Sequence, residues 1–435
     1  MIISSKKGLN PNRPVHLFGA GHPMILAFAA LMGCDLFDSA SYAKFARDDR
    51  MMFIDGTYRL ADMQSLDCNC PACRGHTLES LRKTDKKERE RILARHNLYQ
   101  ITSELALVRR YIREGRLWDL AEIRCRAHPE LLNALRRLKE HRTFMELTDP
   151  ISRDGAMFYT GSETRGRPIF ERYRNRLMSR YIPPTDKAAI FPDSDKPYSK
   201  HYVSDFNKVR TAGYTPIVLS PFGPVPAELD EIYPLAQSLF PQIADRETEE
   251  ETKEFAEEFL KKMGFVDIRQ FGDIEPGELE YDADLLRAKA TSRYQFGMEA
   301  TEALFRGQIE LVVSRKTGKI RNVISDGEHV LSMRASDGLY TLRPEGARRV
   351  LKALPSPRMR SIVMDDAVPF VSNGRNVFCQ FVIDMDEDLR PMEEVIVVDK
   401  DDNFLATGRA WLIKNEVKSL RKGIAVRVRS GNDES

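Results

Sequence analysis

Hydrophobic and polar positions near the start of the chain predict a strand, a buried helix and a second strand. Residues 14–21 read PVHLFGAG and end on glycine, which suits a buried strand followed by a loop. Residues 22–33 are apolar on nearly every side, which predicts a well-covered helix, and residues 34–42 read as a short strand with a polar end. Such a unit makes neighbouring parallel strands, which occur almost only in sheets covered on both faces.

The later pattern predicts a helical stretch and three further domains. Thr84 or Asp85 can cap a long helix, and more helix follows it. Strand-like runs among many prolines then favour a small α/β domain. A hairpin turning at Thr317 and Gly318 favours an α+β domain, and short strands at regular spacing favour a small β-barrel at the end. We therefore place the domains at residues 1–149, 150–244, 245–356 and 357–435.

Composition is that of a multidomain protein of the cytoplasm. The 435 residues are 42% hydrophobic and 30% charged, enough to bury several cores, and we find neither a membrane-spanning run nor a signal peptide. The net charge of +2 neither demands nor excludes nucleic acid. Six cysteines in so long a chain do not make a disulfide scaffold, so a tight cysteine cluster indicates metal binding or redox chemistry.

That cluster lies in the sequence DCNCPACRGHT, where Cys68, Cys70 and Cys73 fall within six positions. Thiolates at this density favour tetrahedral zinc, which needs a fourth ligand. His76 is close in sequence, whereas His96 lies on the predicted long helix, and we favour His96 because the loop could fold back onto that helix. Three sulfurs and one imidazole leave no open position, so the metal would shape the loop and take no part in chemistry. Three free thiols without metal are the alternative.

Two aspartates, Asp35 and Asp38, flank the end of the second predicted strand. Catalytic carboxylates of α/β barrels lie at the carboxyl ends of strands, and an aspartate there can attack carbon and form a covalent intermediate. Aspartates in such positions also cap the following helix, so spacing alone does not decide between the two roles.

A long stretch of the chain resembles a known enzyme family. The sequence HLFGAGHPMILAFAALMGCDLFDSASYAKFARDD, the CNCPAC cluster and the later RHNL are similar to the tRNA-guanine transglycosylases, specifically the archaeal branch that makes archaeosine. The similarity continues through SPFGPVPAELDEIYPLAQS to a carboxyl end that resembles a PUA RNA-binding domain. It implies an α/β fold: the last strands of a (β/α)8 TIM barrel with a zinc-binding subdomain, then small α+β domains and a β-barrel PUA domain.

The resemblance also implies an activity and its residues. One structural Zn2+ per chain would be held by Cys68, Cys70, Cys73 and His96. Asp38 would be the nucleophile that attacks the ribose of guanine 15 in the tRNA D-loop, so that 7-cyano-7-deazaguanine (preQ0) replaces the base. No soluble cofactor is implied. A second carboxylate is required to move protons at the leaving and incoming bases.

The second carboxylate and most of the barrel have no counterpart in these residues. In the family both lie upstream of HLFGAGH, which here begins near residue 16. Two strands alone would leave long apolar edges. We therefore expect a separate polypeptide to supply the earlier strands and the base pocket in an assembly of two chains. A longer polypeptide of which these residues are a part is the competing explanation.

Basic residues near the carboxyl end are candidates for contact with tRNA phosphates. The set is Arg358, Arg360, Arg375, Lys418, Arg421, Lys422, Arg427 and Arg429. By charge alone a solvated strand face explains them equally well, and the PUA resemblance favours RNA binding.

Two rival functions remain. Archaeosine synthase is similar to the transglycosylases and carries a PC-x3-KPY-x2-S-x2-H element, of which this chain keeps Lys196, Pro197 and Tyr198 but has Asp193 in place of the cysteine. The other rival is a non-catalytic subunit that only delivers tRNA. Asp38 and the full set of zinc ligands favour the transglycosylase.

Overall fold

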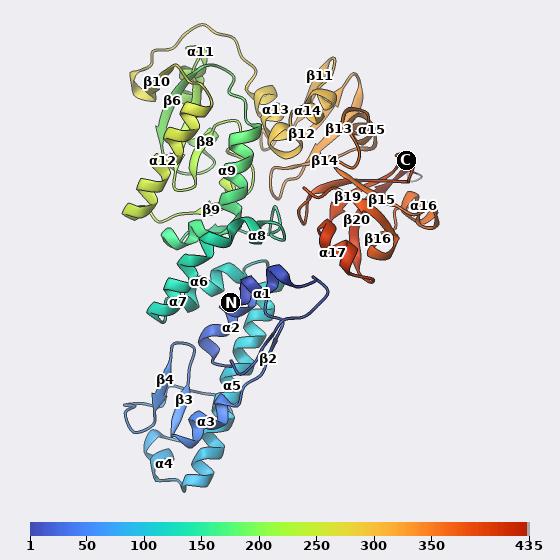
Figure 1. Cartoon of the computed structure of the whole chain (residues 1–435). Helices are drawn as coiled ribbons and strands as arrows, with labels where there is room; N and C mark the ends of the chain where they lie inside the picture. Colours follow the sequence, from blue (N-terminus) through green and yellow to red (C-terminus); the bar gives the residue numbers. More distant parts are fainter. Residues whose placement is uncertain (433–435) are drawn as a thin grey trace. The chain divides into compact units, whose positions relative to one another are not determined.

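The computed structural model describes residues 1–432, and the chain divides into two compact units, Met1–His141 and Arg142–Ser435 (Figure 1). The chain has a mixed α/β fold. No helix among the described residues is long and apolar enough to cross a bilayer.

The first unit starts with the predicted strand, helix and strand. Strands β1 (His16–Leu17) and β2 (Leu36–Phe37) pair in parallel, and helix α2 (Pro23–Leu31) connects them, as predicted. The prediction that the first strand is buried is wrong, because His16 is exposed and Leu17 is only half-buried. The His22 side chain accepts a hydrogen bond from Met24 N and so caps α2, while Pro23 supplies a helical φ at its first position.

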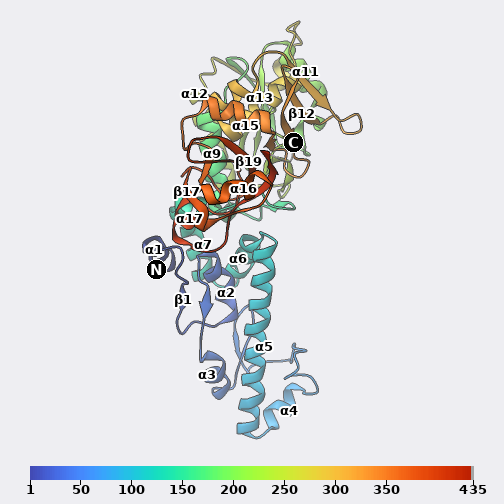
Figure 2. The same ribbon diagram turned by 90° about the vertical axis from the view of Figure 1, so that its right-hand side faces the viewer.

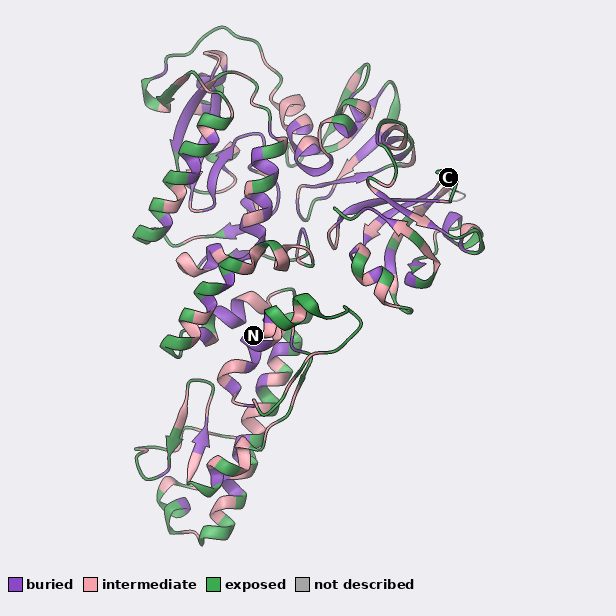
Figure 3. Cartoon of the chain, viewed as in Figure 1, coloured by how far each residue is buried: buried purple, intermediate pink, exposed green. Residues whose placement is uncertain are grey.

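The β1–β2 pair has no further strand beside it in the described part of the chain. Each strand has one exposed and one half-buried residue. Phe18 is 84% exposed and Leu36 is 53% exposed, although both are large apolar side chains. Figure 3 shows that buried residues gather instead on the strands of the second unit. Two large apolar side chains are therefore exposed at or next to this strand pair, and no closed barrel forms among the described residues.

One long helix organises the rest of this unit. Helix α5 (Lys86–Arg113) begins at Asp85, whose carboxylate accepts hydrogen bonds from two backbone N–H groups of its first turn, as predicted (Figure 2). The other elements of the unit are α1 (Ile2–Gly8), α3 (Ser41–Arg47), β3 (Arg50–Met52), β4 (Thr57–Arg59), α4 (Leu78–Lys83), α6 (Leu117–Cys125), α7 (Pro129–Arg136) and a 3-10 turn (Arg137–His141).

The second unit contains a four-stranded sheet in the order β10-β6-β7-β8. Its strands are β6 (Lys187–Pro192), β7 (Thr215–Ser220), β8 (Gly223–Pro226) and β10 (Asp267–Gln270). The first three strands in this order are parallel, and β8 returns antiparallel to β7. Because β10 lies beyond residue 244, the sheet uses residues from both sides of the boundary predicted there.

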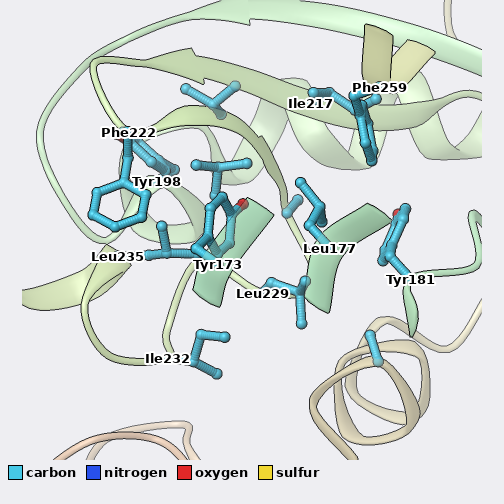
Figure 4. Close-up of a cluster of buried hydrophobic side chains, with 14 of the residues drawn as sticks. Tyr173, Leu177, Tyr181, Tyr198, Ile217, Phe222, Leu229, Ile232, Leu235 and Phe259 are labelled. Atoms are coloured by element: carbon cyan, nitrogen blue, oxygen red, sulfur yellow. The ribbon is translucent and has the colours of Figure 1, made fainter. Parts of the chain in front are cut away.

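Helices cover this sheet and enclose an aromatic core. They are α8 (Arg142–Glu146), α9 (Pro168–Arg180), α10 (Tyr198–His201), α11 (Val203–Thr211) and α12 (Arg246–Lys262). Figure 4 shows Tyr173 and Leu177 of α9 among Tyr198, Phe222 and Leu235, all of them buried. The short parallel pair β5 (Met157–Phe158) and β9 (Ser238–Leu239) lies in the same unit.

A second sheet is antiparallel, in the order β11-β12-β13-β14. Strands β11 (Ile309–Val313) and β12 (Ile320–Ser325) form the hairpin predicted at Thr317 and Gly318, and Gly318 has φ +66°. The remaining elements are β13 (Glu328–Met333), β14 (Tyr340–Leu342), α13 (Ala283–Phe296), α14 (Met298–Leu304) and α15 (Pro344–Ala353).

The carboxyl end forms a six-stranded sheet in the order β16-β20-β19-β18-β15-β17, curved around its own apolar core. Its elements are β15 (Arg360–Val363), α16 (Val368–Ser372), β16 (Val377–Phe378), β17 (Val382–Met385), β18 (Glu394–Val398), β19 (Phe404–Ala410), α17 (Lys414–Ser419) and β20 (Ile424–Gly431). The predicted run of short strands is confirmed.

Candidate functional site

The three clustered cysteines and one histidine converge in the first unit. Cys68, Cys70 and Cys73 lie in the loop before α4, and His96 lies on α5. One ligand atom from each residue lies within 4.8 Å of the others, which is a group that could hold a metal ion. His96 Nδ1 is 3.4, 3.6 and 3.3 Å from the three sulfurs in sequence order. His76 is not part of this group.

The ring of His96 is already oriented for metal binding. Its Nε2 lies 3.0 Å from the backbone oxygen of Met52 on β3, so Nε2 carries the proton and Nδ1 presents a lone pair to the sulfurs. Burial lowers the pKa of His96 to about 4, which keeps the ring neutral. Burial also raises the pKa of the Cys68 and Cys73 thiols, and a bound cation would reverse that effect.

The surrounding core holds the cluster in place. Asn97, next to His96 on α5, is fully buried, and its side chain accepts from Met52 N at 2.7 Å and donates to the backbone oxygens of Tyr42 and Arg50. Cys73 packs in an apolar cluster with Leu81, and both are at most 2% exposed. A donor set of three sulfurs and one nitrogen, with Cys73 and His96 buried, fits a structural metal.

Asp38 lies at the carboxyl end of β2, where its two carboxylate oxygens have different surroundings. Oδ1 is 2.8 Å from His16 Nε2 and accepts a hydrogen bond from Gly19 N at 3.3 Å. Oδ2 has no hydrogen-bond partner among the described residues, and the side chain is 48% exposed. One oxygen is therefore held by two contacts, whereas the other is not held by the described residues.

The neighbouring aspartate has a structural role. Asp35 accepts a hydrogen bond from Val15 N at 2.7 Å and lies 3.9 Å from Lys6 Nζ, so it ties the start of β1 to β2. Helix α3, which follows Asp38, has no side-chain cap. Helix capping therefore does not account for the position of Asp38.

Sequence reasoning missed His16. The residue sits in β1, opposite Leu36 in the parallel register, and only this register brings its ring to Asp38. One signal could have revealed His16. It is a titratable residue on β1, the strand that pairs with β2, and the candidate nucleophile Asp38 directly follows β2.

The predicted RNA-contacting residues divide into two groups. Arg360 is 1% exposed, with its guanidinium bound to both carboxylate oxygens of Asp402 and to four backbone carbonyl groups. It cannot reach a phosphate, so we remove it from the candidate set. Arg429 is bound to both carboxylate oxygens of Glu394. Arg429 is nevertheless exposed, and the other exposed members are Arg358, Arg375, Lys418, Arg421, Lys422 and Arg427.

Three of these exposed cations have particular neighbours, and one of them, Arg358, is paired with Glu299. Arg427 of β20 lies over the ring of Trp411, with its guanidinium carbon 3.6 Å from the ring centroid, in a cation–π contact. Lys418 lies 3.5 Å from Asp384 and is 57% exposed. Such pairs near the surface are weak enough to exchange for contacts with phosphate.

Comparison with protein families agrees with this arrangement. The family model of queuine tRNA-ribosyltransferase matches residues 1–130, which contain Asp38 and the cysteine cluster, and the PUA domain model matches residues 359–431. Between them, a domain of unknown function matches residues 170–272, and the patch-forming domain C2 of tRNA-guanine transglycosylase matches residues 287–357. These matches define the class as a tRNA-ribosyltransferase with an appended PUA domain.

Individual relatives identify the family. The tRNA-guanine(15) transglycosylase of Methanothermobacter thermautotrophicus is 40% identical over 445 residues, which cover 99% of this chain and 68% of the relative. That of Methanocaldococcus jannaschii is 39% identical, over 99% of this chain and 67% of the relative. The chain belongs to the tRNA-guanine(15) transglycosylases, which are pentosyltransferases.

Among solved structures, the crystal structure of a protein of unknown function matches 60% of this chain and 99% of its own length, with a TM-score of 0.46 and 16% identity.

Proposed function

We propose that this chain supplies the nucleophile for exchange of guanine 15 in the tRNA D-loop for 7-cyano-7-deazaguanine, a step of archaeosine biosynthesis in the cytoplasm. The observation that carries the proposal is the carboxylate of Asp38, held through Oδ1 and free at Oδ2. The names of the relatives favour this reaction over the archaeosine synthase alternative.

The reaction proceeds in two displacements. Asp38 Oδ2 attacks C1′ of the nucleotide, the glycosidic C–N bond breaks, and its electron pair leaves with guanine, which takes up a proton. The incoming base then loses a proton and attacks C1′, and the ester bond to Asp38 breaks. Dividing the exchange into two steps lowers each barrier. A second carboxylate must carry the proton between the two bases.

We propose that further polypeptide completes the catalytic domain. A TIM barrel closes with eight strands, whereas the first unit contributes the β1–β2 pair with Phe18 and Leu36 exposed beside it. We propose that the remaining barrel strands, the base pocket and the second carboxylate pack against this edge. A separate chain would give an assembly of two chains, and an extension of the same polypeptide is the other source.

We further propose that the metal is one structural Zn2+, held by Cys68, Cys70, Cys73 and His96. The donor set and the closed core favour zinc over harder cations, which prefer oxygen ligands. When bound, zinc would fix the loop before α4 to helix α5. The residues themselves already hold the imidazole in the required orientation through Met52.

The exposed basic residues of the carboxyl sheet, together with Arg429 once released from Glu394, would bind tRNA through its phosphates. A base exchanged in this way must first leave its stack, at a cost of a few kcal/mol that additional RNA contacts can offset. This explains why one reaction uses several domains.

Exchange of radiolabelled guanine into tRNA tests the proposal. The enzyme is purified from its source with any polypeptide that stays bound, and D38A is compared with D62A, a control in the same unit with an exposed carboxylate. We expect D38A to lose exchange and D62A to keep it. Retention of exchange by D38A would instead make the chain a tRNA-delivery subunit.

A further inference from the structure

A cavity of about 1010 Å³ opens in the second unit and is built from residues that the transglycosylase site does not use. Its walls are the turn after β6, the segment before β5 and the segment from Ala236 to Gln242, with Ser336 at the edge. This volume is at the upper end of the range for small-molecule sites in proteins. The lining includes the lysine of the Lys196-Pro197-Tyr198 sequence noted above.

Lys196 lies against Ser238 and Phe240 at the cavity wall, where burial disfavours the charged form of its amine. Its Nζ lies 2.6 Å from Ser238 Oγ and 3.1 Å from the Ser238 backbone oxygen, and 3.7 Å from the centroid of the Phe240 ring. Burial lowers the pKa of Lys196 to about 7, against the opposing effect of Asp193. Near neutral pH about half of such lysines carry a free lone pair, whereas an ordinary lysine is almost fully protonated.

The turn that carries Lys196 is anchored to the core. It directly follows the carboxyl end of β6, and in open α/β sheets ligands bind outside the carboxyl ends of the strands. Tyr198 closes the turn: its ring is buried between α9 and the Leu235 segment (Figure 4), and its hydroxyl donates a hydrogen bond to Asp193. The amine is therefore presented to the cavity from a rigid support.

The rest of the lining indicates which ligand fits. Asp154, Asp193 and Asp195 are the charged groups beside Lys196 in the lining, and all three are carboxylates that disfavour an anionic ligand. Hydroxyl and amide side chains supply both donors and acceptors; they are Ser194, Gln237, Gln242 and Ser336. An uncharged polar compound suits this wall.

We propose that this cavity binds an uncharged hydroxylated carbonyl compound and that Lys196 is the nucleophile that captures it. The amine nitrogen attacks the carbonyl carbon and forms a C–N bond, while the carbonyl oxygen takes up the proton that the nitrogen loses. The resulting carbinolamine expels its hydroxyl as water, with the second nitrogen proton, and leaves an imine. This capture needs no oxidant or reductant and does not depend on the transglycosylase reaction.

Reductive trapping tests the inference on the chain as it is. The protein is incubated at pH 7 with D-glyceraldehyde and cyanoborohydride, and modified lysines are mapped by peptide mass spectrometry. Lys200, exposed and four residues further along, is the internal control. We expect Lys196 to be modified at least tenfold faster than Lys200, with a rate that saturates as glyceraldehyde rises. K196R should remove this fast phase and K200R should keep it.

Two outcomes would overturn the proposal. One is modification of Lys196 at a rate equal to or slower than that of Lys200. Both lysines are in the same protein molecule, so this comparison does not depend on the folding of a variant. The other is a Lys196 rate that stays linear in glyceraldehyde up to 100 mM, which would show reaction without binding in the cavity. Glyoxylate, an anionic aldehyde, serves as a second probe: faster capture of glyoxylate than of glyceraldehyde would contradict the assignment to an uncharged ligand.

Discussion

Replacing Arg360 with methionine should destabilise the carboxyl sheet without acting on RNA directly. The Arg360 guanidinium makes three hydrogen bonds of 2.8–3.0 Å to the backbone oxygens of Leu351, Leu354 and Arg358. Each is worth about 1 kcal/mol, because the carbonyl left behind in a buried position loses its partner. Asp402 is 41% exposed, so water can replace the guanidinium there and its share of the loss is small. We therefore expect a loss of about 3 kcal/mol.

Hydrogen exchange measured by mass spectrometry resolves this loss within a multidomain chain. Peptides that cover β15 and β18, which pair beside Arg360, should lose about a hundredfold in protection in R360M, since 1.4 kcal/mol corresponds to a factor of ten. The matched control is R427A, whose side chain is exposed on the same sheet. It should leave protection unchanged. A change below threefold in R360M would refute the structural role that we assign to Arg360.

Four further results are expected. R427A should weaken tRNA binding and lower its dependence on the logarithm of salt concentration by about one, as read by filter binding over a salt series. H16N should slow formation of the covalent RNA adduct by about tenfold or more with little change in KM, because Asp38 loses the imidazole ring that holds Oδ1. An unchanged rate would exclude a positioning role for His16. The purified chain should hold one zinc by elemental mass spectrometry, and C73A should lose it whereas C34A keeps it; equal zinc in both would contradict the ligand set. Burial raises the pKa of Asp230 to about 6, so the stability contributed by its neutral form is complete below pH 4 and is lost as pH rises through 6. The free energy of unfolding of D230N, measured in urea, should therefore gain about 3 kcal/mol on that of the native chain between pH 4 and 7. A difference that stays constant over this range would contradict the raised pKa.

The sequence predicted local features of the candidate site better than its long-range pairings. The spacing of Cys68, Cys70 and Cys73 is a short-range pattern, and Asp38 follows a recognisable strand. The contact of His16 with Asp38 depends on the register of β1 against β2, which the hydrophobic pattern of two short strands does not specify. The sequence therefore indicated the position of the candidate nucleophile Asp38 but not the side chain that contacts it.

Arginine positions show the same limit in the carboxyl sheet. Arg360 and Arg427 both read as basic residues beside short strands, yet one is buried and the other exposed. The difference comes from tertiary partners of Arg360, which include Asp402, 42 positions further along the chain, and backbone carbonyl groups. Likewise, β10 pairs with β6 although three strands and three α-helices lie between them in the chain, and no local pattern predicts this pairing. Charge and periodicity identify candidate elements, and tertiary contacts decide which side chains stay in water.

The most direct test of the account is to trap the covalent intermediate. The enzyme, purified from its source with its bound polypeptides, is incubated with tRNA that it has not yet modified, denatured, digested and analysed by mass spectrometry for RNA attached to protein. The account predicts a ribose adduct on the peptide that contains Asp38, absent in D38A. An adduct that persists in D38A, or one that maps to another peptide, would contradict it.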